Sequence, residues 1–140
     1  MKDSFFLDTG ILVYCFDATS KKKYKIASDL VDRGVSSKRG VIGPQVVQEF
    51  LNAATSKFAV LMPVFHAESY LSQFLKPLCR VFSTIDLYRE SLVTRESMKI
   101  SFYDALIISA ALSAGCTELY SEDLQAARTY RGLTIVNPFL

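Results

Sequence analysis

Residues 101–112 have the sequence SFYDALIISAAL, which predicts a helix with one carboxylate, Asp104, near its start. Ser101 is a natural N-cap residue, so Phe102 begins the helix and Asp104 falls at its third position. The next eight residues are nearly all apolar, which indicates that this helix is central and buried. An acid three residues after an N-cap serine is typical of a capping box. Taken alone, Asp104 therefore favours a capping role over a catalytic one.

The composition is that of an ordinary globular protein. The chain has 140 residues, of which 50% are hydrophobic, and this is enough for one domain with a substantial core. No apolar run approaches the roughly 20 residues of a membrane span. Asp8 and Asp17 interrupt the N-terminal stretch, so we expect neither a transmembrane helix nor a signal peptide. The expected location is the cytoplasm.

The cysteines and the histidine exclude several kinds of site. Cys15, Cys79 and Cys116 are odd in number and widely spaced, so we expect reduced core residues and neither a disulfide framework nor a zinc site. His66 is the only histidine, and no nucleophile motif accompanies it. A multi-histidine metal site and a histidine-based hydrolytic triad are therefore not expected. Any hydrolysis must depend on carboxylates.

Short apolar strands alternate with helices along the chain. We expect strands at residues 5–7, 40–42, 80–84, 117–120 and 133–136. Helices are expected at residues 20–34 (followed by a turn at Ser36-Ser37), from Pro44 to about 54, 63–78, 86–99, 102–112 and, more briefly, from about 124 to 130. This alternation predicts an α/β domain with a mainly parallel sheet and right-handed crossovers.

Two of the predicted helices carry features beyond a core face. In the helix at residues 20–34 the expected inward residues are Tyr24, Ala27, Leu30 and Val31. Its first turns hold Lys21, Lys22, Lys23 and Lys25, which form either a solvated face or a place that receives an anion such as an RNA phosphate. The helix at residues 63–78 has an unusually wide apolar side, which favours a partner surface there. Its apolar residues are Val64, Ala67, Leu71, Phe74, Leu75 and Leu78.

Several acids are expected at the same edge of the sheet. Asp8 and the Ser121-Glu122-Asp123 segment each follow a strand, although Asp8 could equally cap the next helix. Glu49 lies at the margin of an apolar helix face, where it is either a solvated edge residue or a residue pointing into a cleft. Carboxylates brought close together repel one another unless a cation lies among them. Oxygen-only ligation favours Mg²⁺ or Mn²⁺, whose usual chemistry is phosphoryl or phosphodiester transfer.

Four motifs, in this order, resemble a PIN domain, and particularly the VapC-like toxins of type II toxin-antitoxin modules. They are FLDT at residues 6–9, QVVQEF at 45–50, SFYDALI at 101–107 and LYSEDL at 119–124, and the resemblance covers nearly the whole chain. It implies a single three-layer α/β domain over residues 1–140, with a mainly parallel central sheet flanked by helices. It also implies a metal-dependent endoribonuclease in which Asp8, Glu49, Asp104 and Asp123 surround Mg²⁺ or Mn²⁺.

The resemblance assigns a role to each acid. Asp8 and Asp104 are expected to ligate the metal directly, while Glu49 and Asp123 act through water or position the attacking hydroxide. Ser121 is expected to be a supporting hydroxyl, and Glu122 is the alternative to Asp123. The chain departs from the family pattern at Gly10, where the family usually has Asn, and also at Gly43 and Ala126-Ala127.

The net charge of the chain gives weak support for a nucleic acid substrate. The formal net charge is +2, so if the four site acids carry −4 the remainder carries +6, which describes an acidic pit in a basic surround. The expected partners are RNA, a cognate antitoxin and a second copy of the chain. Two alternatives remain open: a catalytically weakened PIN-like binding module and another metal-dependent phosphohydrolase. A haloacid-dehalogenase type of phosphatase would need an acid at residue 10, where the chain has Gly10.

Overall fold

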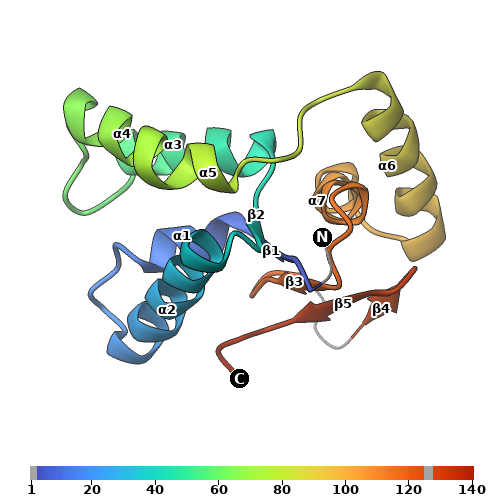
Figure 1. Cartoon of the computed structure of the whole chain (residues 1–140), viewed down its shortest axis with the longest axis horizontal. Helices are drawn as coiled ribbons and strands as arrows, with labels where there is room; N and C mark the ends of the chain where they lie inside the picture. The colour runs from blue at the N-terminus through green and yellow to red at the C-terminus, as the bar shows by residue number, and fades with distance from the viewer. Residues whose placement is uncertain (1–2, 125–127) are drawn as a thin grey trace.

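The computed structural model describes residues 3–124 and 128–140 and shows an α/β domain built on a five-stranded sheet (Figure 1). The strand order is β2-β1-β3-β5-β4. The strands are β1 (Phe5–Leu7), β2 (Gly40–Val41), β3 (Glu118–Tyr120), β4 (Thr129–Tyr130) and β5 (Leu133–Val136). All neighbouring pairs are parallel except β4 and β5, so the predicted mainly parallel sheet is confirmed.

Helices flank this sheet (Figure 1). They are α1 (Thr9–Tyr14), α2 (Lys21–Ser37), α3 (Pro44–Ser56), α4 (Val64–Tyr70), α5 (Lys76–Leu78), α6 (Ile85–Met98) and α7 (Phe102–Ser113), with a π-helical turn, η1 (Leu71–Leu75), between α4 and α5. Helix α6 packs along α7, while α2 packs on α1 and β2. None of the described helices has the length and apolar character needed to cross a membrane.

Helix α7 is the buried helix that the sequence predicts. Ser101 is its N-cap, and the Ser101 hydroxyl accepts a hydrogen bond from the Asp104 backbone N–H at 3.1 Å. The apolar residues that follow are buried on most sides, including Ala105, Ile107 and Ile108. The helix ends before Gly115, whose φ of 74° is the left-handed conformation expected of a C-terminal glycine. Asp104 is thereby fixed in the first turn of the central helix.

The predicted strand at residues 80–84 is wrong. The chain touches the edge of the sheet only through an isolated bridge between Ile42 and Cys79, and then leaves it as an extended connection to α6. Arg80 turns back, and its guanidinium donates a hydrogen bond to the Lys38 carbonyl. Val81 is buried in the core but Phe82 is largely exposed, so the two adjacent apolar residues do not form a buried strand.

The predicted helix running to Tyr130 is also wrong where the structure describes it. Thr129–Tyr130 form β4, which pairs with β5 as a hairpin. Arg131 and Gly132 have φ values of 50° and 85°, and two consecutive positive φ values favour a tight hairpin turn. The departure at Ala126-Ala127 lies outside the described residues.

Two helix boundaries and two side-chain orientations need correction. The expected turn at Ser36-Ser37 is the last turn of α2, and Tyr24 is 47% exposed instead of buried. The segment from Pro63 to Leu78 is divided into α4, η1 and α5 instead of forming one regular helix. Val64 is 74% exposed, whereas Ala67, Leu75 and Leu78 are buried.

Candidate functional site

The four acids predicted from the sequence line one pocket of about 630 Å³, named here the acidic pocket. Asp8 directly follows β1, and Asp123 lies shortly after β3, the strand beside it. Glu49 is on α3, which follows β2, and Asp104 is in the first turn of α7. The pocket thus lies at the carboxyl edge of the parallel strands, where open α/β sheets commonly bind ligands.

Asp8 is held in place by both of its carboxylate oxygens. Its Oδ1 accepts a hydrogen bond from the Thr9 backbone N–H at 2.8 Å, which makes Asp8 the N-cap of α1. Its Oδ2 accepts one from the Ser121 hydroxyl at 2.7 Å. Ser121 is 0% exposed and its Oγ also accepts from the Leu124 backbone N–H at 3.2 Å. Asp8 therefore caps α1, as one interpretation predicts, and it also lines the pocket at the sheet edge, where its role in binding a ligand stays a prediction.

The environment of Asp8 opposes its negative charge. Burial is the main cause that raises the pKa of its carboxyl above the ordinary value, and the hydrogen bonds from Ser121 and Thr9 act in the other direction. The carboxylates of Glu49 and Asp123 raise the pKa further. A bound cation would relieve this repulsion, so the electrostatics of the pocket fit a positively charged ligand.

The other three acids are arranged more openly. Glu49 is exposed, and its Oε1 accepts a hydrogen bond from the Thr9 hydroxyl at 2.6 Å. Asp104 is half-buried and Asp123 is exposed. Among residues 3–124 and 128–140, no three His, Cys, Asp or Glu side chains lie close enough together to hold a metal ion. The donor set, oxygen only, suits Mg²⁺ or Mn²⁺, but the carboxylates line the wall of the pocket without meeting at one point.

Glu122 differs from Asp123 in that its carboxylate has close partners. The Lys23 ammonium lies 2.6 Å from Glu122 Oε2, and the Tyr14 hydroxyl donates to Oε1 at 2.5 Å. These two groups lower the pKa of the Glu122 carboxyl, the lysine contributing most. Lys23 is thus neither a purely solvated lysine nor a free anion receptor. The pairing leaves Asp123 as the more available acid of the two.

The cysteines and His66 do not contribute to the acidic pocket. Cys15, Cys79 and Cys116 are free, with Cys116 buried and the other two half-buried. Burial raises the pKa of the Cys15 thiol to about 11 and that of Cys116 to about 12, so both remain protonated at neutral pH. His66 is exposed, lies against Phe65 and lines a different pocket.

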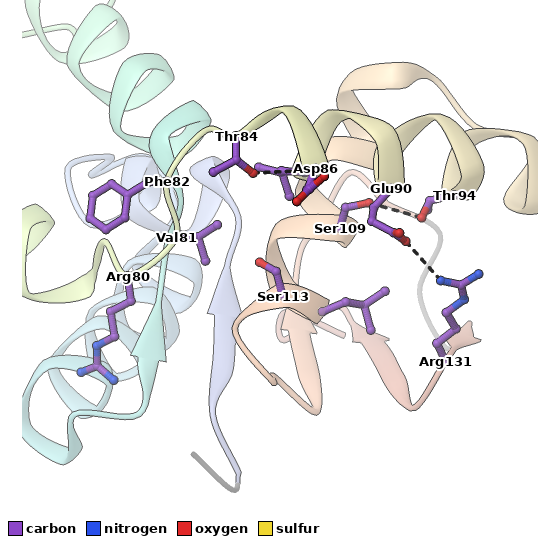
Figure 2. A pocket seen from close by; sticks show the side chains of 12 residues that line it. Arg80, Val81, Phe82, Thr84, Asp86, Glu90, Thr94, Ser109, Ser113 and Arg131 are labelled. Carbon is purple, nitrogen blue, oxygen red and sulfur yellow. Dashed lines mark hydrogen bonds and ion pairs between the residues drawn. The ribbon is translucent and has the colours of Figure 1, made fainter.

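A second pocket, of about 490 Å³, lies between α6, α7 and the connection at residues 80–84 (Figure 2). Its polar groups are largely paired with one another. Ser109 donates a hydrogen bond to the Thr94 hydroxyl at 3.2 Å, and Arg131 forms an ion pair with Glu90 at 3.5 Å. The charges in this second pocket are thus paired within the protein, whereas the carboxylates of the acidic pocket repel one another.

Sequence reasoning missed several residues of the acidic pocket, among them Thr9, Gln45 and Lys57. Thr9 bridges the site, because its N–H binds Asp8 and its hydroxyl binds Glu49. Gln45 and Lys57 also line the pocket. The position of Thr9 directly after Asp8 was a usable signal, whereas Gln45 and Lys57 reach the pocket only because α3 packs against α1.

Comparison with known proteins gives a consistent result. The family model of the PIN domain matches residues 5–132. A solved toxin-antitoxin complex from Klebsiella pneumoniae is 19% identical, with 96% of this chain and 98% of that chain covered and a TM-score of 0.70. VapC20 of Mycobacterium tuberculosis, a sarcin-ricin loop cleaving toxin, is 21% identical over 86% of this chain and 90% of that chain, with a TM-score of 0.58. VapBC2 from Rickettsia felis, bound to a promoter DNA fragment, is 18% identical over 94% of this chain and 96% of that chain, with a TM-score of 0.61. No curated protein matches the chain in sequence.

Proposed function

Because this chain belongs to the PIN domain family, we propose that it is a metal-dependent endoribonuclease, the toxin of a toxin-antitoxin pair, with residues 1–140 forming one PIN domain. The proposed reaction is hydrolysis of phosphodiester bonds in RNA. The observation that carries the proposal is the acidic pocket, in which a half-buried Asp8 lies near two further acids that oppose its charge. The solved relatives of the same fold include toxin-antitoxin complexes and an RNA-cleaving toxin.

We propose Mg²⁺ or Mn²⁺ as the cofactor, held by Asp8 and Asp104, with Glu49 and Asp123 acting through water. When bound, such an ion supplies charge neutralisation at the phosphate and a lower pKa for water. Ser121 and Thr9 keep both Asp8 oxygens in fixed directions, and Thr9 also orients Glu49. Lys57 lines the same pocket and supplies a positive charge for the phosphate backbone.

The proposed protein partners are a second copy of the chain and a cognate antitoxin, in the cytoplasm. An exposed apolar patch at the start of α4 supports a protein interface, since Val64 and Phe65 are 74% and 68% exposed and Val60 and Leu61 lie beside them. Light scattering on the purified protein tests the homodimer. A strict monomer at tens of micromolar concentration would remove this part of the proposal.

The chemistry is tested by incubating the protein with single-stranded RNA and separating the products. Cleavage should require Mg²⁺ or Mn²⁺ and stop with EDTA. Asp104→Asn should abolish it, whereas His66→Ala should not change it because His66 lies in another pocket. Asp86→Asn is the matched control, since Asp86 is also an acid in the first turn of a helix but pairs with Arg89 away from the acidic pocket.

One observation favours a second candidate function, a PIN-like binding module without turnover. Within the described residues the acids do not gather into a group of three metal ligands, and Gly10 supplies no side chain to the pocket. The same assay separates the two functions. RNA that is bound with either ion but never cleaved would support the binding module, and metal-dependent products would support the nuclease.

A further inference from the structure

A third pocket, of about 290 Å³, adjoins the acidic pocket and is named here the aromatic pocket. The two pockets share Gln45, Tyr103 and Ile107 in their linings, so these side chains form the wall between them. The lining of the aromatic pocket includes aromatic rings and side-chain amides: Gln45, Gln48, Tyr88, Phe102 and Tyr103. It contains none of the four acids.

Gln45 has an unsatisfied polar atom at this wall. Its Oε1 is buried and has no hydrogen-bond partner. A buried acceptor without a partner costs free energy, and rotation of the Gln45 side chain into the pocket, where a ligand supplies the missing donor, removes this cost. An amide can donate and accept at the same time, which matches the paired donors and acceptors along the edge of a nucleobase.

Aromatic side chains lie next to this amide. Tyr103 is 68% exposed although it directly precedes Asp104, and its ring meets that of Phe102 edge to face, with centroids 5.9 Å apart. Tyr88 on α6 is also exposed and lines the same pocket. Exposed aromatic rings beside a phosphate-binding site are the usual means of stacking single-stranded bases.

We propose that the aromatic pocket binds one nucleobase of the RNA, the base adjacent to the phosphodiester bond in the acidic pocket. This inference rests on the proposed function, from which it takes the RNA substrate. Gln45 contacts the base edge, and Tyr103, with Tyr88, contacts the base face. Because the two pockets share one wall, an RNA strand whose phosphate lies among the acids has a neighbouring base in the aromatic pocket. Gln45 and Tyr103 then set sequence preference at one position of the cleavage site.

The test measures binding of short single-stranded RNAs by fluorescence anisotropy, with Ca²⁺ in place of Mg²⁺ to neutralise the acids and with the RNA recovered intact. One nucleotide at a time is replaced by an abasic residue. For the wild type, one position should show a loss of affinity of about 5- to 150-fold, the range expected for removal of one stacked base. Gln45→Leu and Tyr103→Ala should each reduce that position-specific loss to less than about 2-fold. Gln73→Leu, a matched substitution of an exposed glutamine outside both pockets, should leave it unchanged.

The outcomes separate this inference from the proposed function. An abasic penalty that is equal at every position, or that survives Gln45→Leu in a folded variant, overturns the inference even if metal-dependent cleavage occurs. A position-specific penalty without any cleavage supports the inference while the nuclease proposal fails. Tyr103→Ala serves where Gln45→Leu does not fold, because truncating an exposed ring opens no core cavity. A dimer that Tyr103→Ala dissociates, with no base dependence, would assign the pocket to a protein interface and overturn the inference.

Discussion

Replacing Asp8 with Asn tests whether the negative charge of Asp8 in the acidic pocket lowers the stability of the folded protein. The substitution keeps the shape of the side chain and an oxygen that caps α1, since Asn and Asp are nearly equal as N-caps. It removes the negative charge that burial, Glu49 and Asp123 oppose. It also weakens the hydrogen bond from Ser121, which costs about 1 kcal/mol for an ordinary hydrogen bond.

The sign follows from the pKa of Asp8. The pKa stays raised above 3.8 even though two hydrogen bonds lower it, so the charge cost exceeds their contribution. Each unit by which folding raises a pKa lowers the free energy of unfolding at neutral pH by about 1.4 kcal/mol. This loss disappears as the pH falls through the raised pKa, where Asp8 becomes protonated. For a chain of this size, 1 kcal/mol corresponds to about 3 to 5 °C in Tm.

The assay is a set of melting curves for wild type and Asp8→Asn. In EDTA at pH 7 the variant should melt at the same temperature as the wild type or a few degrees higher, and the difference should shrink towards pH 3. With Mg²⁺ the wild type should gain about 1.4 kcal/mol when the ion is at ten times its Kd. The variant should gain nothing.

Two results would refute this reasoning. A variant that melts several degrees lower than the wild type in EDTA at pH 7 would show that Asp8 is chiefly a structural cap. An unchanged Mg²⁺-induced rise in the variant would remove Asp8 from any metal site in the acidic pocket.

Three further predictions concern stability. Ser101→Ala removes the N-cap of α7 and should lower the free energy of unfolding by about 1 kcal/mol; an unchanged melting temperature would contradict this. Glu122→Gln should destabilise the protein at neutral pH, because the folded protein lowers the pKa of Glu122 below 4.5. The difference in stability from the wild type should vanish as the pH falls through that lowered pKa. Acid titrations followed by circular dichroism measure this difference. Gly10→Ala adds a Cβ that meets nothing within 4 Å in a helix, so urea denaturation should show a gain of about 0.5 kcal/mol, and a loss would contradict the open space.

The order of the elements was predictable because their signals are local. Three apolar residues before Asp8 predict β1, and Ser101 with the apolar run after it predicts α7, since capping and burial are read from neighbouring residues. The strand at residues 80–84 could not be excluded in the same way. The segment follows the bridge between Ile42 and Cys79, and only the tertiary path of the chain takes it away from the sheet, with Val81 buried in the core and Phe82 exposed.

The placement of the four acids in one pocket was as predictable from the sequence as the order of the elements. The acids at strand and helix ends line one pocket because parallel strands end at one edge, which needs only the element order. The preference for Asp123 over Glu122 came from the resemblance to the PIN family, but its physical support needed the structure, since Lys23 pairs with Glu122 across a long sequence separation. The buried, unpartnered oxygen of Gln45 likewise follows from the packing of α3 and from nothing in its sequence neighbours.

The pairing of β1 has a consequence for how the domain folds during synthesis. Phe5 of β1 pairs with Glu118 of β3, so β1 cannot complete its pairing until β3 has been made. A nascent chain that has not yet emerged beyond Ser121 lacks one neighbour of β1 and the hydroxyl that holds Asp8. Closing so long a loop also slows folding relative to local pairing. The acidic pocket therefore cannot form until residues 118–121 have left the ribosome and packed against β1 and Asp8.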